Sequence, residues 1–462
     1  MGFVLSILYF VTSYLTPPVL FGSLAVYRIE LILDILILFV SLPKLAGSIV
    51  LKTPQSLALF GLTLAAFMSV LIGEHWAGGA VNMFVEFIPN IFTYFFVCLH
   101  CNSKRKLQVL VLMLLFVCLF VTAHGYIDQL HGVPESAHGL PDDEYQANRD
   151  IWETEHPYLT PLGNDVGASY YRIRGLGEIH DPNDFGQLVV CVIPLVFIFW
   201  RAKKMLQNIA FVLLPVCALL YGVFLTHSRG ALLALIAMAV VAGRRRIGTL
   251  PALLVAGGLF AAAMALNFTG GREISAESGS DRTDLWSGSM QLLKSHPLFG
   301  VGAGNLPDYL GHTAHNSVMV CAAELGLFGL YFWSLFLFSS VRDALVTASP
   351  GKVSEGEPIV AEKGLFPQAT KDVDKAEINQ MGRLLVLSLV GFLVAGWFLS
   401  RAIVMTFFLL GGMAEVVYEM ALRRGMIAPR LRLARVLPYA GILTIALILL
   451  MYIMLRTTNL MH

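Results

Sequence analysis

Charged residues are scarce in this chain of 462 residues: Asp, Glu, Lys and Arg together make up 14%, whereas 56% of the residues are hydrophobic. Soluble globular proteins carry roughly 25% charged residues, so the composition argues against a soluble domain. The mean hydropathy of +0.71 agrees with this. The apolar runs are long and do not alternate with polar residues, which is typical of helical membrane proteins rather than β-barrels. We therefore expect membrane lipids, and no nucleic acid, among the partners.

Cysteine is also sparse, and none of the cysteines lies in a large polar loop. The six are Cys98, Cys101, Cys118, Cys191, Cys217 and Cys321. They fall in or beside apolar runs, where cysteine behaves as a small hydrophobic residue. We expect neither disulfides nor a metal site from them, although Cys98 and Cys101 have CxxC spacing. The N-terminus has no basic segment or cleavage site, so no cleaved signal peptide is expected.

Apolar runs are abundant, and they predict an all-α polytopic membrane protein with about twelve transmembrane helices. A further N-terminal run, residues 3–27, is split by Thr16-Pro17-Pro18. It is either one kinked span, which would be a thirteenth, or two half-helices. The twelve runs are residues 29–42, 56–72, 81–99, 107–125, 185–200, 209–225, 231–242, 247–267, 316–341, 384–399, 403–422 and 437–455.

Lys and Arg are concentrated in four connections between these runs. The four groups are Lys104, Arg105 and Lys106; Arg201, Lys203 and Lys204; Arg244, Arg245 and Arg246; and Arg423, Arg424, Arg430, Arg432 and Arg435. All four fall on one side if every run crosses the membrane. The positive-inside rule makes that side cytoplasmic.

Two large loops then fall on the external side, at residues 126–183 and 268–315. The first is acidic, with eleven Asp and Glu against three Arg in residues 126–182. A third polar segment, 342–383, is predicted to be a flexible cytoplasmic connector. The chain thus divides into N-terminal helices (1–125), the first external loop (126–183), central helices (184–267), the second external loop with the catalytic region (268–315), one helix (316–341), the cytoplasmic loop (342–383) and C-terminal helices (384–462).

Arg172 and Arg174 stand at the end of the first external loop. They alternate with other residues, so an extended chain would place both on one side. External arginines next to a membrane run against the positive-inside trend, and guanidinium groups bind phosphate oxygens in a bidentate way. For Arg172, contact with lipid headgroups or pairing with carboxylates of the same loop explains the residue equally well.

His180, Asp181 and Asp184 follow directly and contain groups that can ligate metals. Their spacing does not match a recognised metal site. The sequence Asp-Pro-Asn is typical of a helix cap and first turn. We therefore expect a helix to begin here and no metal to bind.

Thr226 to Gly230 form a very short external turn that contains Arg229. A membrane-embedded arginine is costly unless it is paired or serves an anionic ligand. Arg229 also begins a predicted helix, whose N-terminal amides favour anions. We expect His227, in the same turn, to make a local hydrogen bond rather than to act in catalysis.

Residues 281–330 change from polar to apolar about halfway along the segment. Its first half is polar, rich in glycine and interrupted by Pro297 and Pro307, which predicts a short helix and loop. Gly300, Gly302 and Gly304 predict a tight turn. The second half is apolar without a breaker, which predicts a membrane helix.

His315 and Asn316 lie where this change occurs, and His315 is the candidate catalytic residue. An imidazole titrates near neutral pH, and this one is predicted to lie at the mouth of a membrane helix beneath a polar loop. The alternative is a helix cap or a structural hydrogen bond. Arg282 and Asn316 are possible additional site residues, and Glu324 is expected to be a structural, hydrogen-bonded carboxyl group.

Five short motifs occur in order along the chain. They are Arg174-Gly175, Ser228-Arg229-Gly230, Arg-Thr-x-x-Trp from Arg282, His-Pro-Leu-Phe-Gly-Val-Gly from His296, and His-Asn-Ser from His315 followed by Glu-Leu-Gly. Together they resemble the O-antigen ligase and polymerase superfamily of bacterial inner membranes. The resemblance covers residues 172–329.

The resemblance implies a membrane glycosyltransferase of the GT-C type that needs no metal or other cofactor. Its donor would be a glycan on undecaprenyl diphosphate. Its acceptor would be a sugar hydroxyl of lipid A–core, and transfer on the periplasmic face of the inner membrane would complete lipopolysaccharide. Arg174 and Arg229 correspond to the family's arginines, assigned here to the donor diphosphate, and His315 corresponds to its loop histidine.

Elementary chemistry agrees with these roles. Without a metal ion, fixed guanidinium groups must offset the charge that develops on the leaving diphosphate. An acceptor hydroxyl gains from a general base whose pKa lies near neutrality. A direct displacement would invert the anomeric centre.

Three other functions remain possible from the sequence. An O-antigen polymerase or a protein O-oligosaccharyltransferase would use the same lipid-linked donor with another acceptor. A polysaccharide transporter or flippase would belong to a different class. Transporters usually show inverted repeats, whereas this chain places its polar residues in two asymmetric loops.

Overall fold

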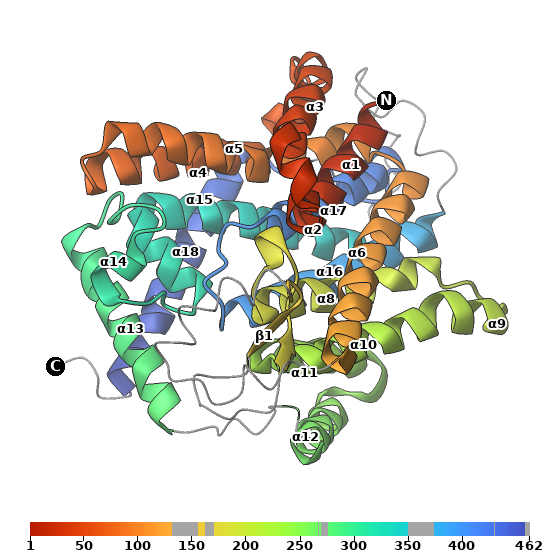
Figure 1. The fold of residues 1–462 in the computed structure, drawn as a ribbon. Helices are drawn as coiled ribbons and strands as arrows, with labels where there is room; N and C mark the ends of the chain where they lie inside the picture. Colours follow the sequence, from red (N-terminus) through yellow and green to blue (C-terminus); the bar gives the residue numbers. More distant parts are fainter. Residues whose placement is uncertain are drawn as a thin grey trace. The chain divides into compact units, whose positions relative to one another are not determined.

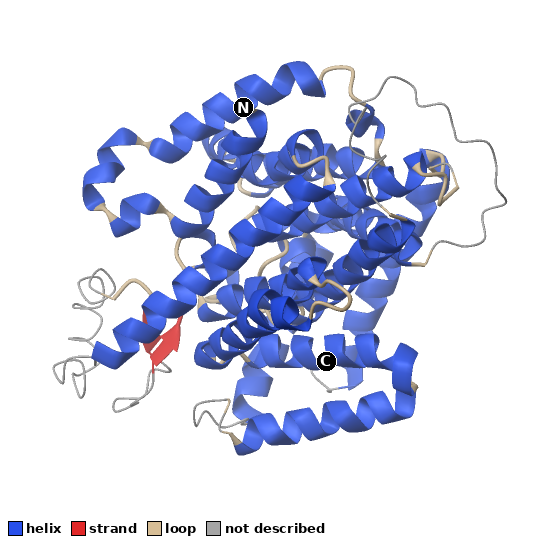
Figure 2. Cartoon of the chain, turned by 90° about the vertical axis from the view of Figure 1, so that its right-hand side faces the viewer, coloured by secondary structure: helices blue, strands red, loops and turns tan. Residues whose placement is uncertain are grey.

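The computed structural model describes residues 1–131, 156–161, 171–266, 268, 276–349, 374–428 and 430–457, and α-helices dominate them (Figures 1 and 2). Two short strands occur in this part of the chain, β1 (Leu159–Pro161) and β2 (Tyr171–Ile173), which pair antiparallel. The predicted class, an all-α polytopic membrane protein, is confirmed. Most of the predicted loop 126–183, and residues 350–373 of the predicted cytoplasmic loop, lie outside the described residues.

The α-helices are α1 (Gly2–Leu15), α2 (Pro17–Leu20), α3 (Ile29–Leu45), α4 (Pro54–Met68), α5 (Ala77–His100), α6 (Lys104–His131), α8 (Pro182–Val196), α9 (Met205–Asn208), α10 (Leu214–Thr226), α11 (Arg229–Ile247), α12 (Thr249–Ala265), α13 (Ala276–Ser295), α14 (Leu306–Leu310), α15 (Ser317–Ala348), α16 (Lys375–Gly396), α17 (Met405–Arg423) and α18 (Leu433–Thr457). Most of the helices follow the apolar runs, whereas α13 and α14 lie in the second predicted loop.

Nine helical segments in the described part of the chain are long and apolar enough to cross a membrane. They cover nine of the twelve predicted spans. The other three predicted spans fall in α3, α11 and α12: α3 and α12 have 17 residues each, and α11 carries arginines at both ends. The split N-terminal run forms α1, α2 and a 3₁₀ helix (Gly22–Tyr27), and α1 ends where Thr16 adopts a left-handed conformation (φ 40°) before Pro17.

The chain folds into two compact units. The first comprises Met1–Ile37, Gln108–Glu273 and Leu387–Ala395, and the second comprises Leu38–Leu107, Ile274–Val386 and Gly396–His462. Arg172, Arg174 and Arg229 belong to the first unit. Arg282, His315 and Asn316 belong to the second.

Glycines let helices approach closely in the first unit. A Cβ atom at Gly186 on α8 would lie 3.1 Å from the Cβ of Ala231 on α11. A Cβ atom at Gly222 on α10 would lie 2.5 Å from the Thr122 Oγ1 on α6. Small residues at such positions allow the backbones of membrane helices to pack against each other. This packing holds the start of α11, and therefore Arg229, next to α8.

The second unit is arranged around α15, which contacts α4, α13, α17 and α18. The helix is interrupted at Gly326, which has φ 67° and ψ −168°. The prediction of an apolar helix without a breaker is wrong at this point. A side chain would not fit here, because a Cβ atom at Gly326 would lie 2.4 Å from the Leu298 carbonyl oxygen.

The loop before α14 fills this interruption. The amides of Leu327 and Phe328 donate to the carbonyl oxygens of Pro297 and Leu298, at 2.8 and 3.1 Å. In return, the amides of Val301 and Gly302 donate to the carbonyl oxygens of Ala323 and Glu324, at 3.0 and 3.2 Å. Backbone groups that the break frees are thus paired within the protein, as burial in a membrane requires.

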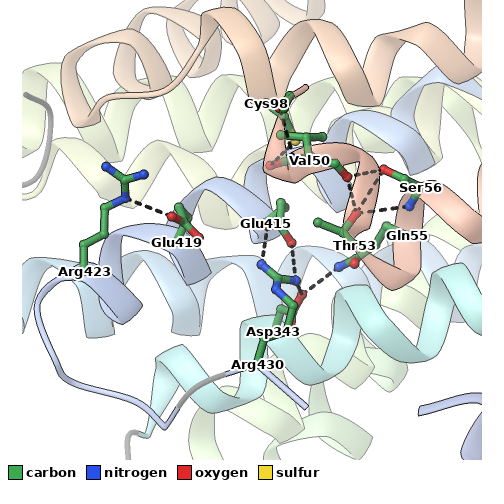
Figure 3. A network of polar contacts seen from close by, with 12 residues as sticks. Val50, Thr53, Gln55, Ser56, Cys98, Asp343, Glu415, Glu419, Arg423 and Arg430 are labelled. Carbon is green, nitrogen blue, oxygen red and sulfur yellow. Dashed lines mark hydrogen bonds and ion pairs between the residues drawn. The ribbon is translucent and has the colours of Figure 1, made fainter. Parts of the chain in front are cut away.

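A buried polar network joins α4, α15, α17 and the segment after α17 in the same unit (Figure 3). Gln55 Nε2 donates to Asp343 Oδ2 at 2.6 Å, and Arg342 Nη1 lies 3.1 Å from Asp343 Oδ1. Arg430 Nη1 lies 2.9 Å from Glu415 Oε2 and 3.9 Å from Asp343 Oδ2. The charges of the Asp343 and Glu415 carboxylates are therefore offset by the guanidinium groups of Arg342 and Arg430.

Candidate functional site

Arg172 attaches the first loop to the helices. It lies in β2 opposite Thr160 of β1. Its Nε donates to the Thr226 carbonyl oxygen and its Nη2 to Asn183 Oδ1, both at 2.8 Å. With only 7% of its surface exposed, the residue links β2 to the end of α10 and the start of α8. Among the described residues, Arg172 thus has a backbone carbonyl and a side-chain amide as partners.

Arg174 follows the end of β2 and is half-buried. Its backbone amide donates to the Tyr158 carbonyl oxygen at 2.9 Å, and its Nε donates to the Pro157 carbonyl oxygen at 3.1 Å. Arg172 and Arg174 are therefore held by different partners. These two hydrogen bonds fix the position of Arg174 beside β1.

The sequence after Arg174 forms the predicted helix cap. Asp181 precedes α8, and its Oδ1 accepts from the Asn183 amide at 2.7 Å, with Pro182 as the first helical residue. The His180 Nδ1 bonds the Gly177 carbonyl oxygen at 2.9 Å. Within the described residues, no three His, Cys, Asp or Glu side chains are grouped so that they could hold a metal ion.

The turn between α10 and α11 presents Arg229. His227 has φ 48°, and its Nδ1 donates to the Phe268 carbonyl oxygen at 2.7 Å. The predicted hydrogen bond is therefore present, although its partner is 41 residues away rather than local. The Ser228 side chain caps α11 by accepting from the Ala231 amide. Arg229 is the first residue of α11 and is half-buried, and no described residue bonds its guanidinium group. A cation at a helix N-terminus suits an anionic ligand.

The glycine turn of the second unit has the predicted conformation. Gly300, Gly302 and Gly304 have φ of 72°, 112° and 85°. Glu324 Oε1 accepts from the Leu306 amide at 3.4 Å, so this carboxyl group supports the turn as expected. The segment before it was predicted less well, since α13 is a helix of 20 residues rather than a short one.

A buried apolar stripe explains the length of α13. Trp286, Met290 and Leu293 are 8%, 4% and 6% exposed and recur at helical spacing. Trp286 Nε1 donates to the Ala314 carbonyl oxygen at 2.8 Å, directly before His315. Arg282 is half-buried and lies four residues before Trp286, hence on the same side of α13.

His315 lies in an unusual backbone conformation at the start of α15. Its φ is 48°, its side chain is exposed, and its amide donates to Ser400 Oγ at 2.9 Å. The cap of α15 is the next residue, Asn316, whose Oδ1 accepts from the amides of Val318 and Met319 at 2.9 and 3.1 Å. The cap role that was the alternative for His315 therefore belongs to Asn316.

Asn316 acts within the protein rather than at its surface. It is fully buried, and its Nδ2 donates to the Trp397 carbonyl oxygen at 3.1 Å. Both ends of the amide are thus used by protein groups. Asn316 positions His315 by holding the start of α15 to the turn between α16 and α17.

From the sequence, no functional residue was assigned to that turn, residues 397–402. Ser317 Oγ donates to the Leu399 carbonyl oxygen at 2.8 Å, and the Arg401 amide donates to Ser317 Oγ at 3.2 Å. A signal was present in the sequence. Ser400-Arg401 repeats the Ser228-Arg229 pair, again in a short turn predicted to be external.

Comparison with known proteins adds a family to this geometry. Residues 214–334 match the family model described as O-antigen ligase. The match covers about a quarter of the chain and includes Arg229, Arg282, His315 and Asn316, but not Arg172 or Arg174. It confirms the resemblance to the O-antigen ligase and polymerase superfamily that the motifs predicted. No curated protein matches the chain.

Proposed function

We propose that the protein is an O-antigen ligase of the bacterial inner membrane, with a GT-C-type fold and its active site on the periplasmic face. It transfers a glycan from undecaprenyl diphosphate to a sugar hydroxyl of lipid A–core. The observation that carries this proposal is the exposed imidazole of His315, which is held at the start of α15 inside the segment that matches the family.

His315 is the general base in this proposal. The acceptor oxygen forms a bond to the anomeric carbon, and its proton passes to the imidazole. The bond between the anomeric carbon and the phosphate oxygen breaks, and undecaprenyl diphosphate leaves with that electron pair. A single displacement inverts the anomeric centre, and the imidazole later returns its proton to water.

Arg229 and Arg174 bind the diphosphate. Arg229 stands at the N-terminus of α11, whose amides favour anions. No described residue bonds its guanidinium group. Arg174 is fixed through its Nε to the Pro157 carbonyl oxygen. Fixed cations aimed at the leaving group stabilise the charge that develops there and fill the role that a metal ion has elsewhere.

The test is a transfer assay with the purified full-length protein in liposomes. Donor and lipid A–core together should give a glycan attached to lipid A–core, whereas donor alone should remain unchanged. Elongation of the donor without lipid A–core would contradict the proposal and indicate a polymerase. Movement of the donor across the bilayer without glycan transfer would indicate a flippase.

A further inference from the structure

Arg401 belongs to the turn 397–402, which is hydrogen-bonded to the start of α15, where His315 lies. Four hydrogen bonds fix the turn 397–402 to the start of α15. Three of them join His315 to Ser400, Asn316 to Trp397 and Ser317 to Leu399. The fourth is made by the Arg401 amide, which donates to Ser317 Oγ at 3.2 Å. These bonds hold the backbone of Arg401 to the start of α15, next to which His315 lies.

The surroundings of this turn are also well fixed. Trp333 Nε1 donates to the Ala402 carbonyl oxygen at 2.8 Å, directly after Arg401. The rings of Trp397 and Trp286 lie 6.5 Å apart at an angle of 80°, and Trp286 bonds the residue before His315. The turn and the histidine are thus parts of one rigid arrangement within the second unit, so a substrate at the imidazole also meets the turn.

The position of Arg401 is notable in a chain that crosses a membrane. The residue is half-buried, and it lies in the turn between α16 and α17, which both qualify as membrane spans. The positive-inside rule places the basic segment after α17 in the cytoplasm and hence this turn on the opposite side. An arginine there opposes the usual charge distribution, as Arg229 does, and a guanidinium fork binds phosphate and carboxylate oxygens.

We propose that Arg401 is a substrate-binding residue that holds a phosphate or carboxylate group of the acceptor glycolipid, so that the acceptor hydroxyl reaches His315. This rests on the proposed function. The donor diphosphate is assigned to Arg174 and Arg229 in the other unit, whereas Arg401 shares its unit and its hydrogen bonds with the histidine that acts on the acceptor. Trp397 is half-buried in the same turn and offers an apolar ring face against which a sugar can pack.

The experiment compares Arg401→Gln and Arg401→Lys with the wild-type protein in the transfer assay. A charge-assisted hydrogen bond is lost in Arg401→Gln, so the KM for lipid A–core should rise about 10- to 100-fold while the KM for the donor stays unchanged. Arg401→Lys keeps the charge but loses the bidentate fork, so its KM for lipid A–core should lie between those of the wild type and Arg401→Gln. Arg435→Gln is the matched control, because Arg435 is exposed on the side predicted to be cytoplasmic and should behave as wild type.

A neutral acceptor gives the decisive comparison. A synthetic oligosaccharide with the same terminal sugar but no phosphate or carboxylate should be used equally well by wild type and Arg401→Gln. An equal loss on both acceptors would overturn the proposal, as would an unchanged acceptor KM or a rise in the donor KM alone. If Arg401→Gln does not fold, Arg401→Lys carries the same comparison.

The two proposals fail in different ways. If the wild-type protein transfers no glycan to lipid A–core, the proposed function is wrong. If the wild-type protein does so and the Arg401 variants bind the acceptor normally, only the role of Arg401 is wrong.

Discussion

Arg430 holds the carboxylate of Glu415 with both of its terminal nitrogens, inside the second unit (Figure 3). The guanidinium group also lies 4.6 Å from the centre of the Tyr418 ring. Glu415 and Asp343 are 3% and 1% exposed, so neither carboxylate can be solvated by water if the arginine is removed. The pair therefore matters for folding of the unit rather than for the reaction.

We predict that Arg430→Ala strongly destabilises the protein. Removing one partner of a buried ion pair costs about 3–5 kcal/mol, because a charge is left buried without compensation. The Lys104–Glu377 pair is a suitable control, since its side chains are 27% and 36% exposed and such pairs contribute about 0–1 kcal/mol. Thermal unfolding in detergent measures both, and equal losses for Arg430→Ala and Lys104→Ala would contradict the prediction.

We predict that His315→Ala abolishes glycan transfer while donor binding remains intact. Loss of a general base costs about 100- to 10,000-fold in rate. The donor is assigned to the arginines, so its affinity should not depend on the imidazole. Single-turnover kinetics and binding of the lipid-linked donor are measured on the same preparation. A folded His315→Ala protein with near wild-type turnover would rule out this mechanism.

We predict that Arg229→Ala weakens donor binding together with turnover. Arg229→Lys should recover part of the affinity, because it keeps the charge but not the bidentate fork. Arg244 lies on the same helix, near its other end, and is exposed. Arg244→Ala should therefore leave the donor affinity unchanged, and an equal effect of both alanine variants would refute the specific role of Arg229.

We predict that Gly326→Ala impairs folding of the second unit. Its φ of 67° with ψ of −168° is accessible to glycine but strained for alanine, and the new Cβ would meet the Leu298 carbonyl oxygen. Gly258 in α12 is the control, because nothing lies within 4 Å of a Cβ placed there. Gly258→Ala should be neutral or stabilise the helix by about 0.5–1 kcal/mol. Similar thermal unfolding of the two variants would contradict this explanation.

We predict that glycan transfer survives treatment with EDTA. The proposed site uses arginines for the electrostatic work. The His180 Nδ1 bonds the Gly177 carbonyl oxygen, and Asp181 caps α8, so both residues already have structural roles. Activity that is lost on chelation and restored by a divalent ion would contradict the prediction and direct attention to His180, Asp181 and Asp184.

Local sequence features predicted much of the first unit. Asp181 caps α8 at the Asp-Pro-Asn sequence, and α11 begins at Arg229, both as predicted. Such features depend on a few neighbouring residues, which is why they can be recognised in one sequence. The side-chain partners of Arg172 were not predictable, since Thr226 is 54 residues away.

Long-range pairing limits what the sequence reveals about the second unit. Gln55 and Asp343 are 288 residues apart, and neither segment contains a pattern that identifies the other as its partner. The break in α15 was missed for the same reason: glycine occurs in many membrane helices, and only the carbonyl groups of Pro297 and Leu298 make a break favourable here. Arg401 could have been recognised as a candidate site residue from the sequence, because its position in a short turn repeats that of Arg229.

The hydrogen bonds between the loop and the broken helix fix the number of residues in this segment. Pro297 and Gly302 are both anchored to α15, so adding or deleting one residue between them would shift every bond that fills the break. Length variation among homologous sequences should therefore be absent from residues 297–302. It should instead accumulate between α15 and α16, in residues 350–373. An alignment of relatives would then show a segment of constant length before α14, and an engineered tag would have to be inserted at another position.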